Sequence, residues 1–221
     1  MIHQQPRQPR AVLWDLDGTL INTAPIHWRA WKEILSAEGV DLTWEQFAPS
    51  FGERNDTALR AWLGPELSDE EIQRISNHKE ELFRASLKNA SLEMLPGAKE
   101  WLARLHEAGW KQALATMTWR ENLEAIFSAS DFRDCFDAMV TAEDVRRGKP
   151  DPEVFLLAAQ RLAVPPARCI VIEDAASGIE AAHQAGMHAI GAGKQTLLKA
   201  DRVVLSLTDL TDKAFDDLVQ P

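Results

Sequence analysis

The part of the chain from residue 98 onward alternates segments of helical periodicity with short apolar runs. Strands are expected near residues 111–117, 138–141, 169–172, 188–190 and 202–205, with helices at residues 98–108, 121–128, 152–162 and 176–185 and a further helix at the C-terminal end. This alternation predicts an α/β fold, a Rossmann-like doubly wound parallel sheet with helices on both faces.

The region before residue 92 contains one expected strand and then only helical patterns. The run Ala11–Trp14 is apolar without alternation, which is typical of a strand covered on both faces. Capping boxes that begin at Thr43 and Ser68 predict the starts of two helices. We therefore expect an inserted α-helical cap domain, residues 22–91, and a core domain formed by residues 1–21 and 92–221.

Two aspartates and a glycine follow the first expected strand. Asp15 and Asp17 are two residues apart, so in extended geometry both carboxylates leave the same side of the chain. Repulsion between two such acids favours a bound cation or a role in proton transfer, and a solvated turn is the alternative. Gly18 allows the backbone to turn directly after them. A calcium loop starting at Asp15 is excluded, because its sixth and twelfth positions would be Leu20 and Ile26 instead of Gly and Glu.

Polar side chains also follow the later strands. The segment Thr116–Thr118 comes at the end of the second strand, Lys149 lies in the loop after the third, and Glu173–Asp174 follow the fourth. Alone, Thr116 is an ordinary strand residue, Lys149 a solvated loop charge and Glu173–Asp174 the acids of a helix N-terminus. Open parallel sheets bind ligands at the carboxyl ends of their strands, so we expect these groups to meet the two aspartates in one site.

Charge and composition limit the partners. The chain of 221 residues has a net charge of −10, which argues against a nucleic-acid partner because a phosphate backbone needs a basic surface. No apolar run approaches the ~20 residues that span a bilayer, and residues 1–10 are too polar for a signal peptide, so no membrane partner is expected. Cys135 and Cys169 show no ligand spacing and are expected to be buried and reduced, which predicts a cytoplasmic protein. The sequence does not indicate an oligomeric state.

Four motifs resemble, in order, those of the haloacid dehalogenase superfamily of phosphotransferases. They are Asp15-Leu-Asp17-Gly18-Thr19, then Thr116, then Lys149-Pro150-Asp151-Pro152, and then Glu173-Asp174, and the resemblance covers nearly the whole chain. The chain is most similar to the branch with a helical cap after the first strand, which includes β-phosphoglucomutase and many small sugar-phosphate phosphatases. Cap-side features that fit this branch are Thr23, His27, Arg29-Ala30-Trp31 and Lys79.

The resemblance implies a division of chemical roles. Asp15 would attack phosphorus and form an aspartyl-phosphate, and Asp17 would act as general acid and base. Thr116 and Lys149 would hold the transferring phosphoryl oxygens, and Lys149 would also pair with Asp15. Dehalogenases resemble the first motif without its second aspartate, so Asp17 favours phosphoryl transfer over dehalogenation.

The same resemblance implies a metal and a substrate pocket. Mg²⁺ would be bound by the Asp15 carboxylate, the Asp17 main-chain carbonyl and Asp174, with Glu173 in the outer shell. Substrate-binding residues are expected at Gly18, Thr23, His27, Lys79, Met117 and Thr118, with Trp28 and Trp119 as further candidates for the pocket wall.

Departures from the β-phosphoglucomutase pattern favour a hydrolase. Ala175 stands where the residue after the Glu-Asp pair is usually Ser. The mutase has an arginine three residues after the position of Gly52, where it grips a second phosphate; this chain has Asn55 there, and Arg54 falls on a different side of the chain. We therefore expect a Mg²⁺-dependent phosphatase of small phosphorylated metabolites, with sugar phosphates as the leading class. A phosphohexomutase and a catalytically silent phosphometabolite-binding protein are the alternatives.

Overall fold

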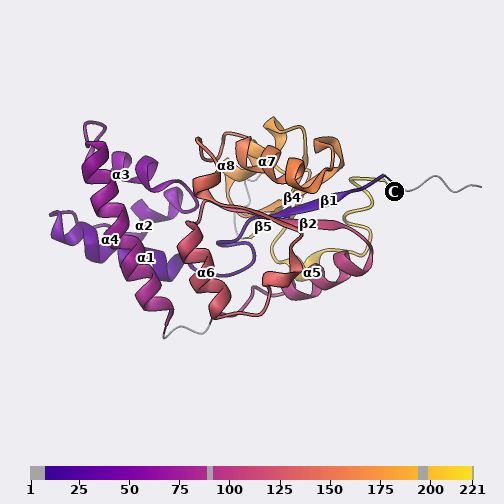
Figure 1. Ribbon diagram of the computed structural model, residues 1–221, viewed down its shortest axis with the longest axis horizontal. Coiled ribbons are helices and arrows are strands. Elements are labelled where there is room, and N and C mark those ends of the chain that lie inside the picture. Colours follow the sequence, from indigo (N-terminus) through magenta and orange to yellow (C-terminus); the bar gives the residue numbers. More distant parts are fainter. Residues whose placement is uncertain (1–7, 89–91, 194–198, 221) are drawn as a thin grey trace, which may run out of the picture.

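The computed structural model describes residues 8–88, 92–193 and 199–220, and a six-stranded parallel sheet forms its centre (Figure 1). The strands are β1 (Ala11–Trp14), β2 (Lys111–Ala115), β3 (Ala138–Val140), β4 (Cys169–Glu173), β5 (His188–Ala192) and β6 (Arg202–Val204). Their spatial order is β3-β2-β1-β4-β5-β6. Because β1 pairs in parallel with both β2 and β4, the residues that follow it lie in the interior of the sheet's carboxyl edge. The predicted α/β parallel sheet is confirmed.

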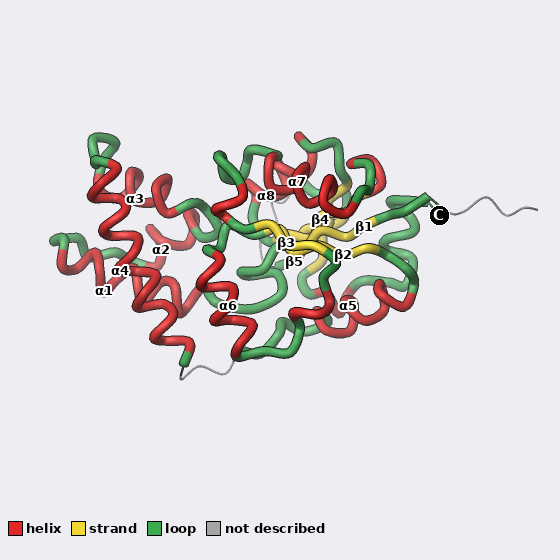
Figure 2. Tube along the Cα trace, viewed as in Figure 1, coloured by secondary structure: helices red, strands yellow, loops and turns green. Residues whose placement is uncertain are grey.

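Helices cover both faces of the sheet (Figures 1 and 2). Residues of β1 alternate between the two layers, with Val12 and Trp14 in one apolar cluster and Ala11 and Leu13 in the other. Every residue of β1 is buried, which explains why its sequence shows no polar alternation. The first layer contains α5 (Ala98–Glu107) and α6 (Arg120–Ser128), and the second contains α7 (Glu153–Leu162) and α8 (Ala176–Gln184).

Four further helices form a separate group at the carboxyl edge of the sheet, on the left of Figure 1. Their apolar faces share a core of their own, in which Trp31, Leu35, Phe47 and Ile75 are buried. The helices are α1 (Ala24–Ala37), α2 (Trp44–Phe47), α3 (Asn55–Leu63) and α4 (Asp69–Leu87).

Local signals set the ends of these helices. Both predicted capping boxes are present, at Thr43 and at Ser68, and each satisfies backbone donors at a helix start. The chain leaves the sheet region and returns to it at adjacent points, because Ile21 and Met94 form an antiparallel bridge. The helical group is therefore joined to the sheet by two neighbouring segments.

The segment after β6 differs from the helix predicted for it. Residues 207–209 form a 3₁₀ turn, and residues 212–218 form consecutive turns. The Asp217 amide donates to the Lys213 carbonyl, four residues back, whereas the Leu218 amide donates to Phe215, three residues back, so no regular helical ladder forms. Phe215 packs against Trp101 and Trp110, and this tertiary burial overrides the local helical pattern.

Two other predictions can be compared with the structure. Cys135 and Cys169 are both free thiols; Cys169 is buried as predicted, but Cys135 is partly exposed. Within the described residues, no helix is both long and apolar enough to cross a membrane.

Candidate active site

The two aspartates of the first motif lie at the end of β1, and both are almost fully buried. The Asp15 amide donates to the Ile172 carbonyl at 3.0 Å, so pairing with β4 continues one residue past the strand. Gly18 then turns the chain with φ of +91°, and its amide donates to the Ile21 carbonyl at 2.7 Å. This tight turn holds the carboxylates of Asp15 and Asp17 at the sheet edge.

Lys149 forms a buried pair of contacts with two acids from different strands. Its ammonium donates to Asp15 Oδ1 and to Glu173 Oε1, each at 2.5 Å. Burial lowers the pKa of Lys149, but the charges of Asp15 and Glu173 outweigh burial and raise the pKa above its usual value. Burial raises the pKa of Asp15 to about 7, although Lys149 acts in the opposite direction. The loop lysine is therefore not a solvated charge.

The other Glu173 oxygen is also occupied. Glu173 Oε2 accepts a hydrogen bond from the amide of Ala175 at 2.8 Å, so the backbone holds this carboxylate where a serine hydroxyl is absent. Gly178, in the first turn of α8, makes room for it, because a Cβ atom there would lie 1.9 Å from Glu173 Oε1. Glu173 is thus fixed by Lys149 and by the start of α8.

Three acids come together in a group suited to a divalent cation. Carboxylate oxygens of Asp15, Glu173 and Asp174 all lie within 4.8 Å of one another. Burial, then the charges of Glu173 and Asp15, raise the pKa of Asp174 to about 9. A Cβ atom at Gly18 would lie 2.1 Å from Asp174 Oδ2, so this approach requires glycine. Hard oxygen donors around shared negative charge are the ligands that Mg²⁺ prefers.

Asp17 has a different environment from Asp15. The hydroxyls of Thr23 and Thr118 donate to its two carboxylate oxygens, one to each. His27 Nε2 lies 3.8 Å from Asp17 Oδ1. Burial raises the pKa of Asp17, but hydrogen bonding from His27 and from the two hydroxyls lowers it below its usual value. The carboxylate form is therefore stabilised by hydrogen-bond donors.

A lysine from the helical group determines which nitrogen of His27 faces Asp17. The Lys79 ammonium lies 2.8 Å from His27 Nδ1, and since an ammonium can only donate, Nδ1 accepts. The Nε2 proton of the neutral ring then points towards Asp17. Burial and the Lys79 charge lower the pKa of His27, which keeps the ring neutral. Phe83 stacks on the same ring, with centroids 4.0 Å apart.

Glu80 connects the helical group to the sheet layer. It is 2% exposed, and its Oε1 accepts from Lys79 at 2.8 Å and from Asn55 Nδ2 at 2.7 Å. Its Oε2 accepts from Asn122 Nδ2 of α6. Burial raises the pKa of Glu80, but the charge of Lys79 and the amide donors outweigh it and lower the pKa.

Sequence reasoning did not identify Glu80 or Asn122. A signal was present on α4, where Lys79 and Glu80 lie on the same buried face as Ile72, Ile75 and Phe83. Charged residues within the apolar stripe of a helix require buried partners.

One cavity joins these groups, and most of the predicted substrate residues line it. Thr116 is among them, and its hydroxyl oxygen accepts from the Thr118 amide at 3.0 Å, which leaves the hydroxyl proton free to donate. Trp119 also lines the cavity, but Trp28 does not, because it packs edge-on against Trp44. Predicted residues that line the cavity are Asp15, Asp17, His27, Lys79, Thr116, Met117 and Thr118. Thr23, Gly18, Lys149, Glu173 and Asp174 adjoin it through the contacts described above.

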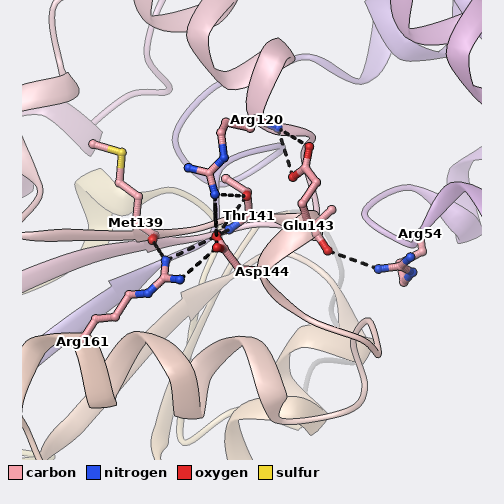
Figure 3. A network of polar contacts seen from close by, with 8 residues as sticks. Arg54, Arg120, Met139, Thr141, Glu143, Asp144 and Arg161 are labelled. Carbon is pink, nitrogen blue, oxygen red and sulfur yellow. Dashed lines mark hydrogen bonds and ion pairs between the residues drawn. The ribbon is translucent and has the colours of Figure 1, made fainter.

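Arg54 and Asn55 face different surroundings, as the sequence predicts. Asn55 donates into the cavity wall at Glu80, whereas Arg54 donates to Asp56. Arg54 also donates, at 3.3 Å, to the Ala142 carbonyl after β3, and Figure 3 shows this contact as a dashed line from Arg54. The arginine therefore contributes to a contact between the helical group and the sheet layer and is absent from the cavity lining.

Figure 3 also shows an acid whose charge is fully matched. Asp144, just after β3, accepts from both Arg161 and Arg120 and from the Thr141 amide and hydroxyl. Hydrogen bonds from Arg161 are the largest cause of a pKa that lies far below the usual value for Asp144. This network joins the carboxyl end of β3 to α6 and α7, shortly before the loop that carries Lys149.

The fold and this arrangement of acids and lysine define a class of protein, and comparison with known proteins gives the family. The family model described as haloacid dehalogenase-like hydrolase matches residues 9–186. The chain belongs to this family.

Its relatives include both mutases and phosphatases. The chain is 35% identical to the β-phosphoglucomutase of Bacillus subtilis over 211 residues, covering 91% of this chain and 92% of that protein. It is 33% identical to hexitol phosphatase B of Escherichia coli K12 over 222 residues, covering 94% and 97%. Its structure is similar to that of β-phosphoglucomutase from Clostridium difficile, with a TM-score of 0.87, 28% identity and coverage of 95% and 96%.

Proposed function

We propose that this protein is a Mg²⁺-dependent phosphatase that hydrolyses monophosphate esters of small metabolites, with sugar phosphates as the leading class. In this proposal residues 22–91 form a cap over a core of residues 1–21 and 92–221. The cap excludes bulk water from the transferring phosphoryl group, and so favours small substrates. The names of the two relatives above support a sugar-phosphate substrate, since one is a hexitol phosphatase and the other a phosphoglucomutase.

The observation that carries the proposal is the difference between two aspartates that are two residues apart. Asp15 contacts Lys149 and belongs to the acidic group, whereas both oxygens of Asp17 accept from hydroxyls. Two carboxylates in such different environments can divide nucleophilic and proton-transfer roles between them.

In the first step, an Asp15 carboxylate oxygen attacks phosphorus and the bond from phosphorus to the ester oxygen breaks. The leaving oxygen takes a proton from Asp17. Lys149 and the free hydroxyl proton of Thr116 bind the phosphoryl oxygens and balance their charge.

In the second step, water attacks the phosphorus of the phosphoaspartyl group and gives its proton to the Asp17 carboxylate. Phosphate leaves and the Asp15 carboxylate is restored. The proton now on Asp17 is the one that the next leaving oxygen receives, so the cycle balances. The lowered pKa of Asp17 means that its carboxylate form is available to accept this proton.

The residues present fit a divalent cation. Asp15 and Asp174 would supply carboxylate oxygens, the Asp17 main-chain carbonyl a third ligand, and Glu173 an outer-shell acceptor. The absence of a Cβ at Gly18 leaves space for Asp174, and the Glu173 oxygens are already held by Lys149 and Ala175. A bound Mg²⁺ supplies positive charge that offsets repulsion among the acids and polarises the phosphoryl group.

The cavity wall favours hydrolysis over a mutase reaction. A mutase has to hold a substrate that carries phosphate at both ends, and the Asn55 amide here is engaged by the Glu80 carboxylate. Arg54 donates instead to Asp56 and Ala142. Both side chains therefore contact protein groups where a mutase would need donors to a second phosphate.

The test is phosphate release from a panel of sugar phosphates, with and without Mg²⁺, by the wild-type protein and by Asp15→Asn. We expect Mg²⁺-dependent release that falls about 10³-fold or more in Asp15→Asn. Asp41→Asn, at an exposed carboxylate, serves as the matched control and should retain full activity. Acid-quenched samples of the wild-type protein should contain a phosphoaspartyl group, detected by mass at Asp15.

Two results contradict the proposal. One is the absence of release from every ester, and the other is equal release by Asp15→Asn. Conversion of a hexose 1-phosphate to its 6-phosphate, primed by a bisphosphate and faster than release, assigns the mutase reaction instead.

A further inference from the structure

The helical group builds one part of the cavity wall, which we call the far wall; Lys149, Glu173 and Asp174 are not among the residues that line the cavity. The cavity and its open mouth together contain about 550 Å³ of space that no protein atom fills, part of which is open solvent. Aromatic residues of the helical group contribute to this wall: Trp31, Phe47, Phe51 and Trp62. Trp119, at the start of α6, also lines the cavity. Aromatic faces pack well against the C–H faces of a carbohydrate chain and carry no charge.

The positive charge of this wall is already paired with other protein groups. Among the described residues, Lys79 is the only lysine or arginine in the cavity lining. Its ammonium donates to Glu80 Oε1 and to His27 Nδ1, each at 2.8 Å. An anionic group at the far end of a substrate would find no unpaired cation there.

Glu53 adds an anion to the same wall. It follows Gly52, whose φ of +89° turns the chain, and it lines the cavity with its side chain half-buried. Burial alone raises the pKa of Glu53, and within the described residues no hydrogen bond or ion pair of its carboxylate offsets this. A half-buried carboxylate that lacks a hydrogen-bond donor is stabilised when a hydroxyl group donates to it.

Within the proposed phosphatase function, on which this inference rests, we propose that Glu53 selects the uncharged end of the substrate. Its carboxylate accepts hydrogen bonds from hydroxyls of a neutral sugar or polyol monophosphate. The same charge repels substrates whose far end carries a carboxylate or a second phosphate. Glu53 thereby acts as a specificity-determining residue, outside the group that transfers phosphate.

The test compares two substrates that differ at one carbon. D-glucitol 6-phosphate ends in a hydroxymethyl group at C1, and 6-phospho-D-gluconate ends in a carboxylate. We expect the wild-type protein to prefer glucitol 6-phosphate by about tenfold or more in kcat/KM, mainly through KM. In Glu53→Gln the preference should fall to about threefold or less, because KM for the gluconate decreases. In Glu53→Lys the preference should reverse.

Controls separate this inference from the function on which it rests. Glu66→Gln makes the same chemical change at an exposed position between α3 and α4, and should keep the wild-type preference. Acetyl phosphate is a short substrate that reports phosphoryl transfer without reaching the far wall.

The outcomes are distinguishable. Failure to hydrolyse any of the three phosphates overturns the proposed phosphatase and the role of Glu53 with it. Hydrolysis of acetyl phosphate together with equal use of both six-carbon esters by the wild-type protein overturns the role of Glu53 alone. A wild-type preference that both Glu53→Gln and Glu53→Lys retain also overturns it.

Discussion

A single acid after β3 and a group of acids after β1 and β4 lie at the same edge of the sheet, and they differ in how their negative charge is matched by positive charge. Asp144, after β3, accepts from two arginines and from Thr141, and its pKa lies below the usual value. Asp15, after β1, shares the ammonium of Lys149 with Glu173, and Asp174, after β4, lies beside these two acids. The pKa values of Asp15 and Asp174 are raised. The matched acid holds strands and helices together. The unmatched acids repel one another, and a cation or a phosphoryl group can relieve this repulsion, which supports the proposal that they are the functional set.

The largest expected effect on stability and activity comes from removing the positive charge of Lys149, which pairs with Asp15 and Glu173. Lys149→Met leaves Asp15 and Glu173 buried side by side, and we expect a loss of about 3–5 kcal/mol in the free energy of unfolding. Phosphate release should fall about 10²–10³-fold. Urea denaturation and the ester assay measure the two effects. Lys32→Met, at a lysine whose partner Asp41 is exposed, should change neither, and equal behaviour of the two variants would refute the distinction.

Removing the negative charge of Asp144 should lower the free energy of unfolding by less than Lys149→Met does, and should leave phosphoryl transfer intact. Asp144→Asn replaces a charged hydrogen-bond acceptor by a neutral one. We therefore expect a loss of about 1.5–3 kcal/mol in the free energy of unfolding at pH 7, with phosphate release largely retained. The pH dependence has a definite sign. Because the folded-state pKa of Asp144 is depressed below 3.8, the stabilisation is fully present above pH 3.8 and is lost as the pH falls further.

Urea denaturation of wild type and Asp144→Asn between pH 7 and pH 3 measures this difference. The difference in unfolding free energy should be constant from pH 7 to about pH 5 and should shrink at the acidic end. A difference that grows on acidification would show that Asp144 is not held as a carboxylate.

A substitution beside the unmatched set tests whether Asp174 needs the space at Gly18. Gly18→Ala combines a positive φ with a Cβ 2.1 Å from Asp174 Oδ2, and should cost about 1–2 kcal/mol from the backbone alone. It should also weaken the dependence of activity on Mg²⁺, because Asp174 must move. Gly64→Ala has φ of +111° but no neighbour within 4 Å, so it reports the backbone cost without the contact. Identical Mg²⁺ titrations for the two variants would exclude a role for this contact.

The smallest expected effect is a pH-dependent response to Mg²⁺. The pKa values of Asp15, about 7, and Asp174, about 9, exceed their ordinary value of 3.8, so the folded protein binds more protons than the unfolded chain. Without metal, stability should therefore fall as the pH rises from about 4 to 9. Added Mg²⁺ should raise Tm more at pH 8.5 than at pH 6.5, because fewer protons compete for the carboxylates. Thermal unfolding with Mg²⁺ and with a chelator measures this, and a larger rise at pH 6.5 would argue against these ligands.

Much of the fold was readable because its signals are local. Most strands of the sheet are short and largely apolar, and each capping box at Thr43 and Ser68 spans four residues, so neighbouring residues alone specify them. The order of chemical groups at the strand ends followed from the same pattern. The prediction of a C-terminal helix was wrong because Phe215 packs against Trp101 and Trp110. These residues lie more than a hundred positions earlier, beyond the reach of any local sequence pattern.

The sequence by itself determined which acids, hydroxyls and lysine gather at one edge of the sheet, since parallel strands end together. Only the tertiary structure decided which acid receives which partner. Lys149 meets Asp15 across 134 positions, and Glu80 meets Asn122 across 42. Burial and the charges brought close by folding set a carboxylate's pKa and the donors available to it, and these depend on distances in space. Two aspartates that look alike in the sequence therefore differ in chemistry once the chain has folded.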